Sequence, residues 1–144
     1  MLSIAAALGG CRDRRVEPRD AAPARSGPTF RADVAPYLAK NCAQVRCHGD
    51  DQDESADLDL RPAVAYRQLV GAASPGRSGA VRVVAGHPEQ SFLVDKLTGK
   101  LGRYEGKRMP LDPQTKDPLP ETAEQSAFVE QVLVPWIAAG ARDE

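Results

Sequence analysis

The sequence predicts a small, mainly α-helical domain with long loops and a disordered N-terminal tether. Two observations support this fold class. Apolar residues recur at helical spacing at both ends of the segment 29–142. The 144 residues also include 12 prolines and 12 glycines, which favours loops between short helices. No run of about 18 apolar residues is present, so no membrane-spanning helix is expected.

The clearest element is the last helix. Thr122 and Gln125 form a capping-box pattern, in which each side chain bonds to the main chain of the other residue. Gly140 is expected to end the helix, and Pro135 to kink it. Its apolar stripe consists of Phe128, Val129, Val132, Leu133, Trp136 and Ile137.

A first helix is predicted from the helical spacing of Phe30, Val34 and Leu38, and it leads directly into Cys42. Pro36 is tolerated only in the first turn of a helix, so this helix is expected to begin close to Asp33.

The segment between these two helices is predicted to hold shorter elements. A helix over 63–70 closes at Gly71, and another runs from Pro88 to Leu97 and ends at Gly99. Residues 81–85 are expected to pair briefly as a strand, and residues 99–121 to form a loop. The acid-rich residues 50–59 are interpreted as a solvated loop.

The N-terminus is interpreted as a signal peptide over residues 1–10. It lacks a basic start and a long apolar core, so either it is truncated or it is not a signal. Leu8-Gly9-Gly10-Cys11 looks like a bacterial lipobox, which implies that Cys11 carries lipid. Residues 11–28 mix charge with proline and small residues and are expected to be a flexible linker. The alternative is an apolar terminus with an incidental cysteine.

The chemistry is concentrated in Cys42-Ala-Gln-Val-Arg-Cys47-His48. In a c-type haem site, two thiols add to the porphyrin vinyl groups and the adjacent histidine binds the iron. The usual spacing places two residues between the cysteines, whereas this chain has four. The pattern predicts one covalent haem held by Cys42 and Cys47, with His48 as an axial ligand.

Two residues compete for the other axial position of the iron. Met109 lies before Pro110 in the long loop, where proline keeps the preceding residue out of helical geometry. Its thioether is a soft ligand that raises the potential of haem iron. His87 is the alternative, but its place before Pro88 favours a capping or surface role.

Several segments in order resemble the small single-haem domains related to class I cytochrome c that occur in bacterial lipoproteins, including the planctomycete-type cytochrome c domains. They are residues 30–38, Cys47-His48-Gly49, Leu58-Asp59-Leu60, residues 83–93, Met109-Pro110 and residues 136–141. The resemblance implies a helical domain wrapped around one haem c. It also implies thioether bonds at Cys42 and Cys47, and His48 and Met109 as iron ligands. The first and last helices are expected to pack together over the haem edge.

The expected function is electron transfer on the periplasmic side of a bacterial membrane, with lipid at Cys11 as the anchor. The partner is an unidentified redox protein, and the chain is an electron carrier or a redox subunit of a larger enzyme. No general base or nucleophile pair is evident, so independent enzyme activity is not expected. Nucleic acid is excluded as a partner, because the net charge is -1 and no basic face is present.

Three other interpretations remain open. A displaceable Met109 favours a haem-based ligand-binding or sensory domain. Cys42, Cys47, His48 and His87 formally make a zinc set, although adjacent Cys47 and His48 are poorly placed to share one tetrahedral ion. A structural lipoprotein with a Cys42–Cys47 disulfide is the third.

Overall fold

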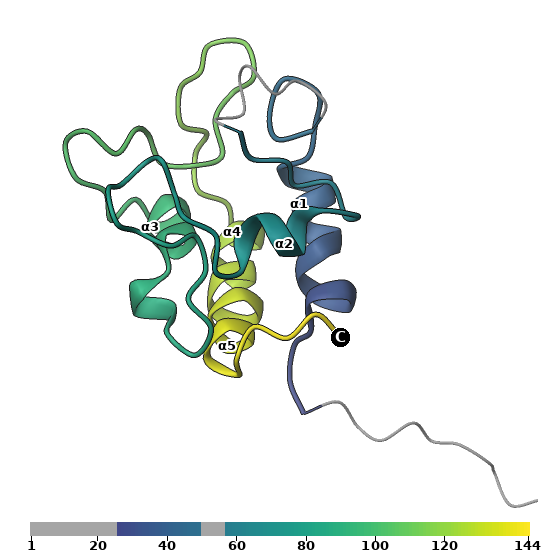
Figure 1. Ribbon diagram of the computed structural model, residues 1–144. Coiled ribbons are helices and arrows are strands. Elements are labelled where there is room, and N and C mark those ends of the chain that lie inside the picture. Colours follow the sequence, from purple (N-terminus) through teal and green to yellow (C-terminus); the bar gives the residue numbers. More distant parts are fainter. Residues whose placement is uncertain (1–25, 50–56) are drawn as a thin grey trace, which may run out of the picture.

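The structure is a computed structural model that describes residues 26–49 and 57–144. The predicted signal segment 1–10, Cys11, the linker up to residue 25 and the acidic residues 50–56 lie outside the described residues. Within the described ranges the chain forms four helical segments and no strand, so the prediction of a mainly α-helical fold is confirmed (Figure 1).

The first helical segment joins a π-helical turn, η1 (Phe30–Val34), to an α-helix, α1 (Ala35–Asn41). The hydroxyl of Thr29 caps it by accepting a hydrogen bond from the N–H of Ala32 at 3.4 Å. The expected start near Asp33 is therefore wrong, and Pro36 lies inside the helical segment. The main-chain bond from Ala35 back to Phe30 spans five residues, and this wider turn accommodates the proline ring.

The last helical segment repeats this arrangement. It consists of α4 (Ala123–Ala127), a π-helical turn η3 (Phe128–Leu133) and α5 (Val134–Ala138). Val134 donates its N–H to the carbonyl of Val129, again across five residues, and Pro135 follows directly. The helix therefore widens ahead of Pro135, and helical structure continues beyond it. The predicted helix is confirmed in its extent.

Shorter elements lie between these two segments. The structure has α2 (Ala65–Leu69), a 3₁₀ turn η2 (Pro88–Gln90) and α3 (Phe92–Thr98), so the helix predicted from Pro88 is interrupted at Ser91. Gly99 ends α3 at a φ of 77°, a conformation that favours glycine. Residues 81–85 contribute only isolated bridges to single loop residues, so the predicted strand does not form.

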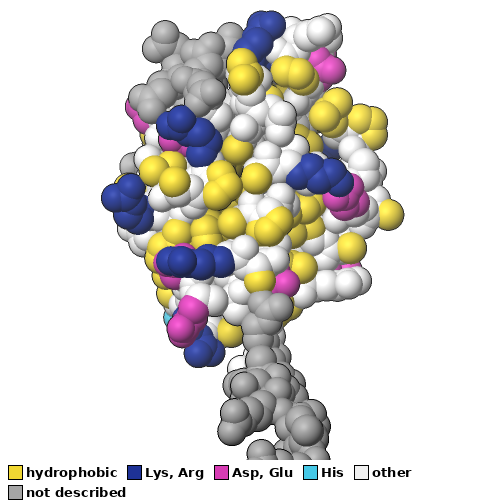
Figure 2. All heavy atoms as spheres, turned by 90° about the vertical axis from the view of Figure 1, so that its right-hand side faces the viewer, with side chains coloured by type: hydrophobic (Ala, Val, Ile, Leu, Met, Phe, Trp, Pro, Cys, Tyr) yellow, Lys and Arg dark blue, Asp and Glu magenta, His cyan; other side chains and the backbone are white. Residues whose placement is uncertain are grey.

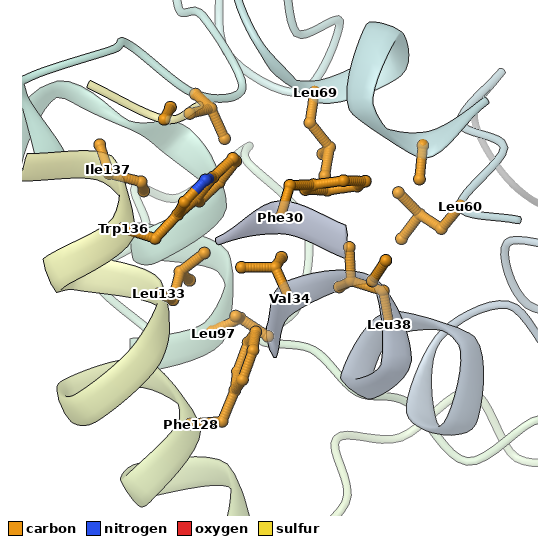
Figure 3. Packing of buried hydrophobic residues seen from close by; sticks show 14 of the residues in the cluster. Phe30, Val34, Leu38, Leu60, Leu69, Leu97, Phe128, Leu133, Trp136 and Ile137 are labelled. Carbon is orange, nitrogen blue, oxygen red and sulfur yellow. The ribbon is translucent and has the colours of Figure 1, made fainter. Parts of the chain in front are cut away.

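The first and last helical segments pack against each other as the apolar stripes predict. Phe30 meets Trp136 with ring centroids 5.6 Å apart, and Tyr37 stacks on Phe128 at 3.6 Å with the rings nearly parallel. Figure 3 shows this core, with Phe30 and Val34 facing Trp136 and Leu133. Leu60, Leu69 and Leu97 from the intervening segments complete the cluster.

The residues after α5 fold back over the start of the first helix. The Trp136 indole donates to the carbonyl of Arg142 at 2.8 Å, and the Tyr66 hydroxyl donates to the carbonyl of Ala141 at 3.0 Å. Ala141 is fully buried. This segment therefore ties α2 and the last helix to the start of the first.

Figure 2 shows the face of the molecule over α1 and α2. Hydrophobic side chains reach the surface in its middle, and basic and acidic side chains are interspersed around them. This mixing agrees with the net charge of -1. No helix in the described part of the chain is long and apolar enough to cross a membrane.

Replacing Leu133 with alanine is expected to lower the free energy of unfolding by about 2–5 kcal/mol, because its fully buried side chain leaves a cavity between the two packed helices. Urea denaturation followed by circular dichroism measures the change. Glu130→Ala, at an exposed position in the same turn, is the control and is expected to stay within about 0.5 kcal/mol of the parent protein. Equal losses in the two variants contradict the packing described here.

Candidate functional site

The loop after α1 and the long loop after α3 come together at one end of the molecule (Figure 1). Two adjoining cavities lie at this end. The first, here called the thiol-side cavity, has a volume of about 350 Å³, and its lining includes Cys47. The second, the leucine-side cavity, has a volume of about 160 Å³ and reaches the core. Cys42, His48 and Met109 line both. The structure thus brings all four residues of the predicted haem site to one place.

The four residues between the cysteines form an ordered bulge. Gln44 turns back and donates its side-chain amide to the carbonyls of Ala39 and Lys40, at 3.0 and 2.9 Å, so it caps the end of α1. Arg46 adopts a positive φ of 67°, which reverses the chain. The N–H of His48 then closes the loop onto the carbonyl of Cys42 at 2.9 Å. The four residues between the cysteines are therefore accommodated by a bulge in the chain.

The residue after the histidine must be small. A side chain at Gly49 would place its Cβ 2.8 Å from the carbonyl oxygen of Ala43 and 2.9 Å from that of Gln44. Both contacts are to main chain, which cannot give way as a flexible side chain can. Gly49 therefore allows the bulge and the chain beyond the histidine to pack closely.

The two thiols are free, so the interpretation of a structural Cys42–Cys47 disulfide is not supported by this structure. Burial, and to a lesser degree the neighbouring Cys47, raises the pKa of Cys42 to about 12. Cys42 is therefore a neutral thiol at physiological pH. This argues against a role as a thiolate nucleophile in the unmodified chain.

His48 is oriented by the segment Leu58–Leu60. Its Nδ1 lies 3.2 Å from the carbonyl oxygen of Leu58, and its own carbonyl accepts the N–H of Leu60 at 2.8 Å. A carbonyl oxygen only accepts, so Nδ1 carries the hydrogen in this contact. A ring N–H held by a main-chain carbonyl is also the usual arrangement in a histidine that binds a metal through its other nitrogen.

Asp59 holds this segment in place. Arg61 donates to it from its main-chain N–H at 2.9 Å and from its guanidinium at 2.6 Å. These hydrogen bonds lower the pKa of the Asp59 carboxyl below its usual value. Asp59 is only 7% exposed, so the prediction of a solvated loop fails at the end of the acid-rich stretch. Arg61, two positions after Asp59, is the feature of the sequence that could have predicted this pairing.

Met109 begins a short hairpin-like excursion over residues 110–119. Its peptide bond to Pro110 is cis. Leu119 donates its N–H to the carbonyl of Pro110 at 2.9 Å, and Asp112 caps the tip by accepting from the N–H groups of Gln114 and Thr115. The predicted loop over 99–121 is confirmed, and Met109 lies at a stem fixed by hydrogen bonds.

The leucine-side cavity is apolar with two cations in its lining. Phe92 and six leucines contribute to its wall and exclude water. The leucines are Leu38, Leu58, Leu60, Leu69, Leu93 and Leu97. Arg82 and Lys96 line it as well, and burial lowers the pKa of both. A ligand that suits this cavity is mainly apolar and carries negative charge.

His87 lies away from both cavities. It is exposed, its Nδ1 is 3.0 Å from the carboxylate of Glu89, and its side chain does not cap the 3₁₀ turn that follows. In the described part of the chain, no three His, Cys, Asp or Glu side chains come together to hold a metal ion. The zinc set with His87 is therefore not assembled, and the competing assignment of His87 as an iron ligand has no support in this geometry.

Gln125 has a role that sequence reasoning missed. Thr122 caps α4 as predicted, by accepting the Gln125 N–H at 3.1 Å. The Gln125 side chain, however, does not return to Thr122 to complete the capping box. It turns into the core and donates to the carbonyls of Leu97 and Met109. A threonine followed three residues later by a glutamine fits both a capping box and an inward-turned glutamine, so the sequence pattern alone could not distinguish the two.

Asp59→Asn is expected to reduce stability at pH 7, because the folded state holds the carboxylate form through Arg61. A pKa that is lower in the folded state stabilises the protein above the unfolded carboxyl pKa of about 3.9. This contribution to the free energy of unfolding is lost as the pH falls through the pKa of Asp59 in the folded state. The difference in unfolding free energy between parent and variant should therefore shrink in acid.

Urea titrations between pH 7 and acid pH measure this difference. Asp117→Asn serves as the control, because Asp117 pairs with Lys107 in an exposed position where an ion pair contributes little. A difference between Asp59→Asn and the parent protein that does not change with pH contradicts the prediction.

The comparisons with known proteins identify no relative. No protein-family model matches this chain, and no curated protein or solved structure is significantly similar to it. The assignment of a function therefore rests on the two cavities and on the residues that line them.

Proposed function

We propose that this protein is a monohaem c-type cytochrome that carries electrons. In this proposal Cys42 and Cys47 hold one haem c covalently, while His48 and Met109 are the ligands of its iron. The observation that carries the proposal is that all four residues, which come from two distant loops, line the thiol-side cavity.

The residues present fit the group in three respects. The cavities pass from thiols and ligand atoms at one side to a leucine-rich wall at the other, which suits a flat apolar macrocycle. Two thiols and an adjacent histidine match the donor set of haem attachment. Arg82 and Lys96 supply positive charge for the two carboxylates of a haem.

When bound, haem supplies an iron that exchanges one electron between its ferric and ferrous states. The chain's own residues set the conditions for that exchange. With its Nδ1 hydrogen held by the carbonyl of Leu58, His48 would bind the iron through Nε2. Met109 supplies a thioether, which favours the reduced iron. The leucines exclude water, so little solvent rearranges during electron transfer.

The remaining parts of the proposal concern location and partners. A lipid at Cys11 would anchor the protein to a bacterial membrane on its periplasmic side, with the residues up to 28 as the tether. Its partner is a redox protein, and it works as a free carrier or as the redox subunit of a larger enzyme. Val45 is exposed in the bulge between the two cysteines, and it would contact such a partner beside the thiol-side cavity.

Co-expression with a c-type haem maturation system tests the proposal. The purified protein is expected to show a Soret band and sharp reduced bands, and to retain its haem in a denaturing gel. His48→Ala should abolish the native reduced spectrum, whereas the control His87→Ala should leave it unchanged, because His87 is exposed and lies outside both cavities. A protein without covalent haem, or loss of the spectrum in both variants, contradicts the proposal.

Met109→Ala is expected to remove the far-red absorption band of a thioether–iron bond and to lower the reduction potential. The potential should fall by about 59 mV for each tenfold loss of preference for ferrous iron. Leu111→Ala, which alters a neighbouring residue of the cavity lining, is the matched control and should retain the band. An unchanged band and potential in Met109→Ala would exclude Met109 as a ligand.

A further inference from the structure

The side chain of Gln125 is a buried amide that donates both of its hydrogens to main-chain carbonyls. It is 3% exposed, and its Nε2 lies 3.0 Å from the carbonyl oxygen of Leu97 and 3.1 Å from that of Met109. Because both partners can only accept, the orientation of the amide is fixed by chemistry. Gln125 therefore links α4 to the end of α3 and to the Met109 loop.

The main chain of Met109 is held on its other side as well. Its N–H donates to the carbonyl of Lys96 in α3 at 2.8 Å. The ammonium group of Lys96 in turn donates to the carbonyls of Glu105 and Lys107, at 3.1 and 2.7 Å, so it fastens the chain that leads to Met109. On the carbonyl side, the guanidinium of Arg108 lies at 3.3 Å, a longer contact than that of Gln125.

We propose that Gln125 is the positioning residue for Met109, holding its main chain so that the thioether stays directed into the cavity toward the iron. This inference rests on the proposed function. A methionine side chain has three rotatable bonds, so the place of its main chain decides which positions the sulfur can reach. A ligand held in place before binding loses less entropy when it binds.

A purely structural role for Gln125 makes a different prediction. The carbonyl of Leu97 lies near the end of α3, where helix carbonyls lack hydrogen-bond partners within the helix. One hydrogen of the Gln125 amide is enough to satisfy that carbonyl. The second hydrogen is donated to the carbonyl of Met109. A structural role lowers stability on substitution but leaves the iron ligand unchanged, whereas a positioning role changes the ligand itself.

The test compares haem-loaded variants of the full chain. Gln125→Glu keeps the size of the side chain but replaces the amide donor, and Gln125→Met keeps its length with no donor, in case the first fails to fold. Ser91→Ala is the matched control. Ser91 is 1% exposed and its hydroxyl also bridges two main-chain groups, of Val84 and His87, but it lies outside both cavities.

Two readouts separate the roles. In the Gln125 variants the far-red thioether–iron band is expected to weaken or disappear, and the affinity of the ferric protein for added imidazole to rise about tenfold, the scale of one lost hydrogen bond. Ser91→Ala should lose stability while keeping the band and the weak imidazole binding of the parent protein.

The outcomes distinguish this inference from the proposed function. A parent protein that binds haem and shows the band, together with Gln125 variants that keep both band and imidazole affinity, overturns the inference alone. Equal changes in Ser91→Ala also overturn it, because they show a general loss of stability. A parent protein without haem, or without a thioether band, overturns the assignment of Met109 and the inference with it.

Discussion

The antiparallel packing of the first helix on the last is the contact on which the rest of the structure depends. It buries Phe30, Val34, Leu133 and Trp136 against one another, and burial of apolar surface is the main favourable contribution to folding. The ion pair between Lys40 and Glu124, at 2.7 Å, marks the end where α1 finishes and α4 begins. Both of its side chains are exposed, so apolar packing, not this pair, fixes the alignment.

This alignment is what gives the molecule a site. It places the end of the first helix beside the start of the last helix. Cys42 and His48 follow the first, and Gln125, whose amide donates to the carbonyl of Met109, lies at the start of the last. α3 stands against the same end and accepts the N–H of Met109. The segment that follows α1 lines one half of the thiol-side cavity, and the loop after α3 lines the other. A shift of the last helix against the first would reach Met109 through the hydrogen bond from Gln125 to its carbonyl.

Much of this could be predicted from the sequence. The stripe that includes Phe128 and Trp136 predicted the last helix because its residues are spaced for one buried face. The Cys42–His48 motif predicted where the candidate site lies because its residues are close together in the sequence. Other features depend on contacts between distant segments. The carbonyl of Leu58 that orients His48 and the inward turn of Gln125 have no pattern of their own. The helix start at Phe30 was missed because a π-helical turn that makes room for Pro36 has no recognised signature.

These wide turns also explain the spacing of the buried residues. Phe30, Val34 and Leu38 follow one another at intervals of four, as do Val129, Leu133 and Ile137. In an α-helix of 3.6 residues per turn, each interval of four advances about 40° beyond a full turn, so such a row winds around the helix. A π-helical turn takes in more residues and opposes that drift. The wide turns beside the two prolines thereby oppose the winding of both rows, which meet where η1 packs against η3.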